Sequence, residues 1–489
     1  MQARSNSRFT RALAPLLLAL VLAGCATAPP PLPQPLAPLP TQFKEGGSRW
    51  LAAAPAEAQP RGEWWKSFAD PVLDGLVERA AAGNTSVHEA AARLAQARAQ
   101  ARRVDAERAP QIGLGASAGR QAGAGTANGA APATLLGVGA NLAYEVDLFG
   151  RMARSGEAAT LDAQAREGLL QSTRLLVQAE TAQTYLTLRA LDAERSLVRQ
   201  TLAAYRDTLR LTERRFQAGD VAELDVARVQ TELASTESDA LALDRRRSEL
   251  EHALAVLIGE AASAFSLDAG DWTAALPLVP PGVPASVLAR RPDVAAAQNT
   301  LLAAQARLGV ARAAWLPAIS LTAAGGLASP ELGDLFKWSA RAWGIGALLS
   351  LTLFDGGQRE AGVQGAQAQL DAALAAYRGQ VLTAFKEVED QLAALRLLQQ
   401  QAEAQGRAVA SAQRATVLSD SRYRNGLISQ LELLDARRSE LRSRRQAVQV
   451  SSAQYLATVG LIRALGGGWD GAPTQQGTEP SDEQQFARH

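Results

Sequence analysis

The segment that decides the fold is LGVGANLAYEVD, residues 136–147. Apolar residues alternate in it with glycine and polar residues, so one face of an extended strand would be apolar and the other small or polar. The apolar face would carry Leu136, Val138, Ala140, Leu142, Tyr144 and Val146. Segments of about ten residues with this alternation are typical of strands that cross an outer membrane. A half-buried strand of a soluble sandwich alternates in the same way, so both alternatives stay open at this point.

Three more segments follow this pattern, at residues 111–119, 319–323 and 343–353. The apolar positions are Ile112, Leu114, Ala116 and Ala118 in the first, Ile319, Leu321 and Ala323 in the second, and Trp343, Ile345, Ala347, Leu349, Leu351 and Leu353 in the third. The sequence therefore predicts four strands, two in each half of the chain.

The two halves of the chain are copies of one unit, in which position i of the first copy matches position i + 207 of the second. Apolar, proline and glycine positions match from end to end, for example Pro110 with Pro317 and Gly219 with Gly426. One constant shift over so many positions indicates a structural duplication. We expect the first repeat at residues 61–266 and the second at residues 267–471.

Each repeat also predicts a long helical hairpin. From about Gly150 to Ala218 there is no proline, and apolar residues recur every seven positions. The repeating positions are Leu170, Val177, Leu191, Val198 and Tyr205 in the first copy and Leu374, Val381, Val388, Leu395, Val409 and Tyr423 in the second. Sustained heptads favour supercoiled helices, and a helix of roughly 65 residues would be about 100 Å long.

Helix ends are marked by glycine and by capping patterns. Gly219 and Gly426 would end the first helix of each hairpin, and the next helix would start at Asp220 or at Ser429, each with Glu three residues later. A shorter helix would start at a capping box, Ser86-Val87-His88-Glu89, and its copy would start after Pro292-Asp293. Each repeat therefore predicts a short helix, a two-stranded ribbon and a long antiparallel coiled coil.

The N-terminus is typical of a bacterial lipoprotein. Residues 1–24 have a basic start, an apolar stretch and small residues before Cys25, which predicts a signal peptide that is removed. Cys25 is the only cysteine in the chain, and Leu22-Ala23-Gly24-Cys25 has the pattern of a lipobox. We expect a covalent diacylglycerol and an N-acyl lipid on it, although a chance cysteine after an ordinary signal peptide is the alternative. Residues 25–60 would be a Pro- and Ala-rich linker, and residues 472–489 a disordered tail.

Composition excludes several other classes of protein. The chain has 50 basic and 49 acidic residues, so no basic field favours nucleic acid. Its three histidines lack metal-ligand spacing, and neither a phosphate-binding glycine loop nor a nucleophile elbow is present. We therefore expect no enzyme activity and, apart from the lipid, neither a cofactor nor a metal.

Four strands cannot close a barrel on their own, and an open sheet edge in lipid leaves backbone groups without hydrogen bonds. Three copies of the chain would supply twelve strands, enough to enclose an aqueous lumen. The fold class that follows is α+β: long antiparallel coiled coils forming an α-barrel, with four transmembrane strands per chain completing a 12-stranded trimeric β-barrel.

Motifs in both halves resemble the TolC-type outer-membrane factors, in particular the lipoprotein branch called NodT-like or OprM-like. They are Glu63-Trp64-Trp65-Lys66-Ser67-Phe68-Ala69-Asp70-Pro71, Tyr144-Glu145-Val146-Asp147-Leu148-Phe149-Gly150, Leu288-Ala289-Arg290-Arg291-Pro292-Asp293-Val294, Leu353-Phe354-Asp355-Gly356-Gly357 and Ala464-Leu465-Gly466-Gly467-Gly468-Trp469. The resemblance implies an efflux channel in the outer membrane of a Gram-negative bacterium, lipid-anchored, with a large periplasmic part. It also implies a homotrimer, a periplasmic membrane-fusion adaptor and an inner-membrane pump of the resistance-nodulation-division (RND) type.

The resemblance assigns roles to two groups of residues. Leu431, Asp435 and Arg438 match the segment that constricts the periplasmic end of the pore, where a solvated surface ion pair is the simpler alternative. The hairpin tips match the adaptor-docking turns, where ordinary turn chemistry is the alternative. The tip residues are Arg215, Phe216, Gly219, Arg422, Tyr423 and Gly426.

Two other functions remain as alternatives. One is a structural coiled-coil lipoprotein without a pore, which would not need lipid-facing strands. The other is an exit duct for polypeptides in type I secretion. A passive tube takes its selectivity from its pump, so the sequence does not name the substrate.

Overall fold

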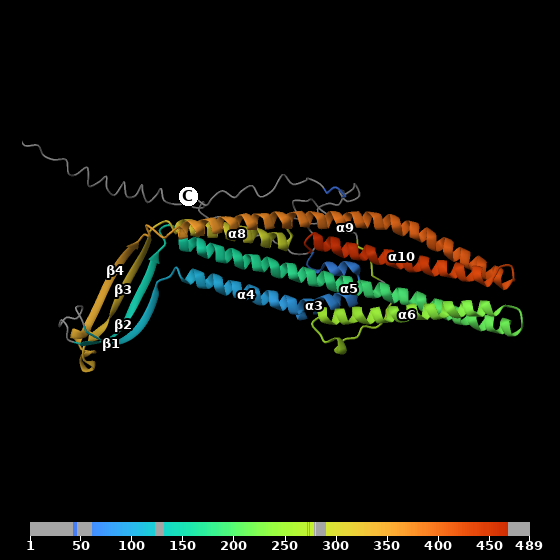
Figure 1. Cartoon of the computed structure of the whole chain (residues 1–489), viewed down its shortest axis with the longest axis horizontal. Helices are drawn as coiled ribbons and strands as arrows, with labels where there is room; N and C mark the ends of the chain where they lie inside the picture. The colour runs from blue at the N-terminus through green and yellow to red at the C-terminus, as the bar shows by residue number, and fades with distance from the viewer. Residues whose placement is uncertain are drawn as a thin grey trace, which may run out of the picture. The chain divides into compact units, whose positions relative to one another are not determined.

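The computed structural model describes residues 43–45, 61–122, 132–270, 272, 274–277, 279 and 290–467 (Figure 1). The predicted signal peptide, Cys25 and the C-terminal tail lie outside these residues. The elements are η2 (Arg61–Phe68), α3 (Pro71–Gly83), α4 (Thr85–Ala106), β1 (Gln111–Gln121), β2 (Ala133–Val146), α5 (Arg151–Gln217), α6 (Glu223–Leu257), η3 (Ala262–Ala264), α8 (Pro292–Ala313), β3 (Ala318–Ser329), η4 (Leu332–Asp334), η5 (Trp338–Ala340), β4 (Arg341–Ser350), α9 (Gln358–Arg424) and α10 (Gln430–Ala464).

The duplication is confirmed by the positions of the helices. Helices α5 and α9 both have 67 residues, and α6 and α10 both have 35. Helices α8, α9 and α10 begin and end at the positions that the sequence shift assigns to them from α4, α5 and α6. Among the described helices, none combines the length and the apolar character needed to cross a membrane.

The compact units of the structure cut across the two repeats. Among the described residues, one unit comprises 90–122, 132–168 and 296–380, and the other comprises 43–45, 61–89, 169–270, 272, 274–277, 279, 290–295 and 381–467. The first unit contains the strands and the second contains the hairpin tips. Each repeat runs through both units, because its long helices start in the first unit and end in the second.

All four strands form one antiparallel sheet in the order β1-β2-β3-β4. Strand β2 of the first repeat pairs with β3 of the second, so the two predicted ribbons join into a single sheet. Directly paired residues lie on the same face of a sheet. Val138 pairs with both Ala116 and Leu327, and Ala323 pairs with both Leu142 and Ile345. The register therefore places the four predicted apolar faces on one side of the sheet.

On the edge strands β1 and β4, that apolar side is exposed in the single chain, whereas most of its residues on β2 and β3 are half-buried. Leu114 is 89% exposed, and both Trp343 and Ile345 are 80% exposed. The opposite side is rich in glycine, and two of its glycines bring β2 and β3 unusually close. A Cβ on Gly326 would lie 2.3 Å from the carbonyl oxygen of Val138, and one on Gly139 would lie 2.8 Å from that of Gly325. Only glycine fits this approach without moving the backbone.

The last strand is shorter than predicted. Strand β4 ends at Ser350, so Leu351 and Leu353 lie beyond it. The chain must turn there from the sheet into α9, and Gly356 and Gly357 adopt positive φ angles of 62° and 91° in that turn.

A carboxylate then caps α9. Asp355 accepts hydrogen bonds from the backbone N–H groups of Gly357 and Arg359 at 3.1 Å each, and from the Arg359 Nε at 2.6 Å. The hydrogen bond from Arg359 lowers the pKa of Asp355 below its ordinary value. The chain turns at this corner, so strand β4 ends at Ser350, although the alternating pattern of the sequence continues to Leu353.

The start of the short helix was predicted at the wrong residue. Helix α4 begins at Thr85, and the side chain of Asn84 accepts hydrogen bonds from the N–H groups of Ser86 (2.9 Å) and Val87 (3.3 Å). Asn84 thus caps the helix, and Ser86 lies inside it. Sequence reasoning also missed α3, whose first turn is capped by Asp70.

Candidate functional site

The two hairpin turns have the predicted glycine geometry. Gly219 and Gly426 have φ angles of 81° and 71°, in the left-handed region that L side chains rarely adopt. The cap differs between the two turns. Ser429 and Glu432 form the predicted capping box at the start of α10, whereas α6 starts after Ala222 without a side-chain cap, so the expectation of a cap at Asp220 was wrong.

The predicted tip residues divide into packed and exposed ones. The Arg215 guanidinium lies over the Tyr423 ring, 5.1 Å from its centroid, so the two predicted tips contact each other. Tyr423 is buried, whereas Phe216, Arg422 and the unpredicted Leu427 are exposed. The surface that a partner could contact at the tips therefore includes Phe216, Arg422 and Leu427 but not the Tyr423 side chain.

The three predicted constriction residues lie in the first turns of α10. Spacings of four and three residues place Leu431, Asp435 and Arg438 on one helix face, and all three are exposed in the single chain. Arg438 donates a hydrogen bond to Asp435 at 3.1 Å. The same guanidinium also contacts Glu232 on α6, whose side chain is only 14% exposed. The hydrogen bond to Glu232 raises the pKa of Arg438 above its ordinary value.

Glu232 and the neighbouring Arg437 were not predicted. Arg437 donates to the Thr208 hydroxyl on α5 at 2.6 Å and to Asp420 on α9 at 3.1 Å. Two adjacent arginines on α10 thus hold the second hairpin to the first, one through α6 and one through α5. The adjacent arginines Arg437 and Arg438 are the only signal in the sequence that could have indicated these contacts. Their partners on α5, α6 and α9 depend on how the helices are aligned.

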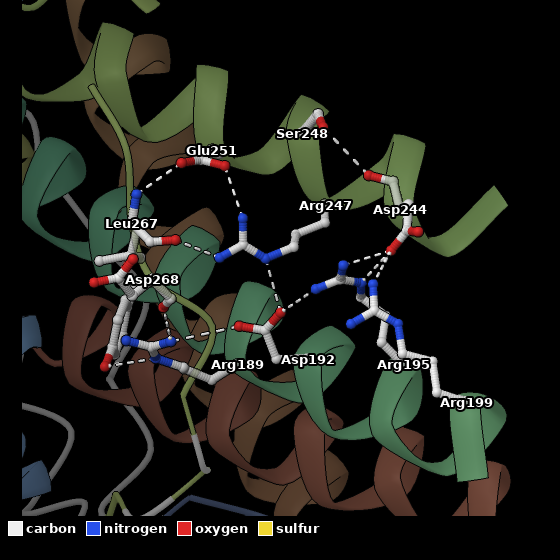
Figure 2. Close-up of polar contacts among 11 residues, drawn as sticks. Arg189, Asp192, Arg195, Arg199, Asp244, Arg247, Ser248, Glu251, Leu267 and Asp268 are labelled. Carbon is white, nitrogen blue, oxygen red and sulfur yellow. Dashed lines mark hydrogen bonds and ion pairs between the residues drawn. The ribbon is translucent and has the colours of Figure 1, made fainter. Parts of the chain in front are cut away.

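A buried ion-pair network joins α5 to α6, as Figure 2 shows. The Asp192 side chain is 4% exposed and lies 3.4 Å from Arg189, 3.0 Å from Arg195 and 2.8 Å from Arg247. Arg189 also donates to the Asp268 carbonyl at 2.8 Å, which ties the segment after α6 to the same cluster.

The second hairpin has no copy of this network. At the positions that match Asp192, Arg195 and Arg247 in the second repeat stand the neutral residues Gln399, Ala402 and Gln454. Sequence reasoning missed the network because charged residues in a heptad pattern usually indicate a solvated face. The first hairpin is therefore clamped by buried charges that the second hairpin lacks.

The return helix of each hairpin ends at a matching junction. The Asn84 side-chain amide donates to the Leu257 carbonyl at 2.8 Å. At the matching positions of the second repeat, Arg291 donates to the Ala464 carbonyl at 2.9 Å. The last carbonyls of a helix have no partner within it, so both contacts supply one. Arg291 also pairs with Glu387 on α9 at 2.7 Å, and the Arg291-Pro292-Asp293 motif is therefore a structural junction.

A family model described as "Outer membrane efflux protein" matches residues 76–260 and 283–467. The second matched segment begins and ends at the positions that the repeat shift assigns to it from the first, in agreement with the duplication. The two segments together cover most of the chain and include both hairpins and both pairs of strands.

Individual proteins and structures are similar over nearly the whole chain. The Outer membrane protein OprJ of Pseudomonas aeruginosa is 35% identical over 467 residues, which cover 93% of this chain and 95% of OprJ. The Cation efflux system protein CusC of Escherichia coli is 30% identical, with 94% and 98% covered. The crystal structure of the Campylobacter jejuni CmeC outer membrane channel superimposes with a TM-score of 0.85 at 25% identity, covering 91% of this chain and 95% of that one.

Proposed function

Because the chain belongs to the outer membrane efflux protein family, we propose that three copies of it form one passive export duct across the outer membrane and the periplasm. Membership confirms the resemblance drawn from the motifs. The chain is thus an outer-membrane channel subunit of an efflux system and not an enzyme.

The observation that supports the proposed trimer is that the four-stranded sheet has two open edges. Strands β1 and β4 each pair on one side only, and the apolar face that includes Leu114, Trp343 and Ile345 is exposed. In lipid, each unpaired backbone group costs several kcal/mol. Three sheets joined edge to edge, β4 of one copy to β1 of the next, would pair every strand and turn the apolar face to lipid. The glycine-rich face would then line the lumen.

The second hairpin supplies the proposed constriction. Three-fold symmetry would bring three copies of Leu431, Asp435 and Arg438 towards one axis. The support is that these residues share an exposed face of α10, while Arg438 holds that helix to Glu232. Since the buried network ties α5 to α6 in the first hairpin and has no copy in the second, we propose that the second hairpin is the one that moves when the duct opens.

The partners follow from the family and from the tips. We propose that the duct works with a periplasmic membrane-fusion adaptor and an inner-membrane pump of the RND type. The exposed Phe216, Arg422 and Leu427, carried by the turns at Gly219 and Gly426, offer the adaptor an apolar and basic surface.

The anchor and the substrate are also proposals. A diacylglycerol and an N-acyl chain on Cys25 would hold the mature N-terminus in the outer membrane, since several acyl chains anchor stably where one does not. Relatives are named for the export of cations, toluene and pyoverdine. Such different cargoes favour a passive tube for small molecules, with selection made by the pump.

Planar-bilayer recording on the purified protein tests the duct. We expect a native mass of three chains and discrete conductance steps whose number follows the amount of trimer added. A trimer that never conducts would favour the pore-free coiled-coil alternative, and a monomer in detergent would contradict the shared barrel. Conductance with no change in small-molecule export in cells lacking the protein would favour the polypeptide exit duct.

A further inference from the structure

The apolar face of the sheet carries two arginines. Arg120 lies two residues after Ala118 on β1, and side chains two apart on a strand share a face. Arg341 lies two residues before Trp343 on β4 and pairs directly with Leu327, so it belongs to the same face. Every other residue of this face in the four strands is uncharged. The only two charges on the apolar face are therefore both positive.

Both arginines lie at the same end of the sheet, the end without helices. Helices α4 and α8 lead into β1 and β3, and α5 and α9 follow β2 and β4, so all four helices join the sheet at its other end (Figure 1). Arg120 is near the last residue of β1, and Arg341 is the first residue of β4. In the proposed duct the helical part lies in the periplasm, so the two arginines lie at the end that faces the cell exterior.

Their distance from the helical end places them at the edge of a membrane. Arg120 is eight positions from Ile112, and Arg341 is eight positions from Leu349, which is roughly 27 Å at about 3.4 Å per residue. Strands tilted by about 40° would cover about 20 Å of height over that length, close to the ~25 Å apolar band of an outer-membrane barrel. A lipid-facing arginine destabilises a barrel at the midplane of the bilayer and much less at its interfaces. Both arginines therefore lie at the level of the outer head groups.

Neither arginine is neutralised by the part of the chain that the structure describes. Both are exposed, and neither forms an ion pair with a described residue. The connection from β3 to β4 carries charges of its own, but its Asp334 pairs with Lys337 at 2.5 Å. Its other acidic residue, Glu331, forms no ion pair with either arginine. Two guanidinium groups are thus left to pair with a negative charge outside the chain.

Arg341 lies beside two exposed tryptophans. Its Nε donates a hydrogen bond to the Trp338 carbonyl at 2.9 Å, and its guanidinium lies over the Trp338 ring. Trp338 and Trp343 are 78% and 80% exposed. Tryptophan is enriched where a bilayer meets water, because its ring is apolar while its N–H is polar. The Nη groups of Arg341 donate no hydrogen bond to a described residue and so are available to a ligand at this interface.

We propose that Arg120 and Arg341 bind phosphate groups of a phosphorylated glycolipid in the outer leaflet, of the lipid A kind. The inference rests on the proposed function, because it requires the apolar face to meet lipid. A guanidinium donates two parallel hydrogen bonds to a phosphate, which makes arginine well suited to this group. The acyl chains of the same molecule would cover the apolar face next to the arginines, so one ligand satisfies both parts of the site.

The charge of the ligand favours a glycolipid over a phospholipid. A phosphate monoester, as in lipid A, carries about −1.5 to −2 charges at pH 7 and three acceptor oxygens. The phosphodiester of a phospholipid carries a single charge. Two cations without a counter-charge on one face therefore fit a ligand with phosphate monoesters better, and a trimer would carry such a pair on each copy.

Native mass spectrometry of the purified full-length protein, incubated in detergent with diphosphorylated lipid A, tests the site. We expect the parent trimer to retain lipid A and the Arg120→Gln/Arg341→Gln variant to bind it at least about tenfold more weakly, because each arginine donates charge-assisted hydrogen bonds. Lys337→Gln is the matched control for Arg341→Gln. It removes a positive charge at the same end of the sheet, but one that Asp334 already neutralises, so it should bind lipid A like the parent.

Two other probes distinguish the source of the phosphate. Inorganic phosphate should not displace bound lipid A, because it has no acyl chains for the apolar face. Phosphatidylglycerol, a phosphodiester, should bind the parent more weakly than lipid A does. Displacement by inorganic phosphate, or equal binding of phosphatidylglycerol, would overturn the assignment to a glycolipid.

The outcomes also separate this site from the duct. Unchanged binding of lipid A in a double variant that remains trimeric and conducts would overturn the site and leave the duct standing. A monomeric parent would overturn the duct and the site with it. If the double variant does not assemble, Arg120→Gln and Arg341→Gln are measured singly. Each should then weaken the binding of lipid A, and binding equal to the parent's in both would overturn the site.

Discussion

Removal of the Arg438 ties should open the duct. In the Asp435→Ala/Arg438→Ala variant, Arg438 loses its contacts to Asp435 on its own helix and to Glu232 on α6. If these residues ring the constriction, the closed form loses one set of ties in each of three copies. We expect higher conductance and passage of large antibiotics that the parent excludes, with little change in the heat stability of the trimer.

The structure sets the size of the effect. Side chains of Arg438 and Asp435 are 44% and 59% exposed, so their pair contributes about 0–1 kcal/mol. The contact to Glu232 is less exposed on one side, and we assign it about 1 kcal/mol after allowing for solvent screening. The loss is then about 1–2 kcal/mol per copy and about 3–6 kcal/mol per trimer. A closed state favoured by a few kcal/mol would no longer dominate.

Single-channel recording in planar bilayers measures this shift directly. The matched control is Asp225→Ala/Arg228→Ala, which removes an Asp–Arg pair at the same spacing in the first turns of α6. This control should conduct like the parent, because Arg228 stands at the position equivalent to Asp435 in the hairpin without a proposed constriction. Two further variants separate the contributions: Asp435→Asn removes only the carboxylate ring, and Glu232→Gln removes only the tie to α6.

Conductance equal to the parent's in the double variant would refute the constriction and return Asp435 and Arg438 to a solvated surface pair. Increased conductance in the α6 control as well would refute the claim that only the second hairpin carries the constriction. An effect in Glu232→Gln without one in Asp435→Asn would locate the restraint at the hairpin contact and not at the carboxylate ring.

Three other changes have definite expected results. Cys25→Ser should abolish incorporation of labelled palmitate while the protein still reaches the outer membrane, and label in the variant would contradict the lipobox. Gly326→Ala should lower the yield of heat-stable trimer, because its Cβ would meet the Val138 carbonyl at 2.3 Å, whereas Gly344→Ala, with open space around it, should not. Asp192→Asn should destabilise the first hairpin by about 1–3 kcal/mol, because it removes the buried carboxylate that Arg189, Arg195 and Arg247 share, while Arg195 keeps Asp244 and Arg247 keeps Glu251; an unchanged unfolding midpoint by circular dichroism would contradict that.

Much of this fold could be predicted from sequence because its signals are local or repeat along the chain. Alternation, heptads and turn glycines each depend on a few neighbouring residues, and the constant repeat shift placed the second copy once the first was recognised. Errors arose where two local patterns competed. Ser86 had the pattern of a capping residue, but Asn84 caps the helix, and Leu351 continued the alternation into a corner.

The candidate site, too, could be predicted from the sequence only in part. The heptads and the motif placed Leu431, Asp435 and Arg438 together on α10, and their spacing along one helix was enough for that. The residues that α10 contacts could not be predicted from local patterns, because Glu232 is 206 residues from Arg438 in the sequence, and Thr208 is 229 residues from Arg437.

The sequence by itself determined the duplication, the hairpins, the apolar strand faces and the residues at the tips, since backbone periodicity and turn geometry follow from short-range order. Only the tertiary structure decided which side chains meet. The alignment of α5, α6 and α10 placed Asp192 among three arginines and gave Arg438 a second partner. Such contacts depend on the register between helices far apart in the chain, and a one-dimensional pattern does not contain that register.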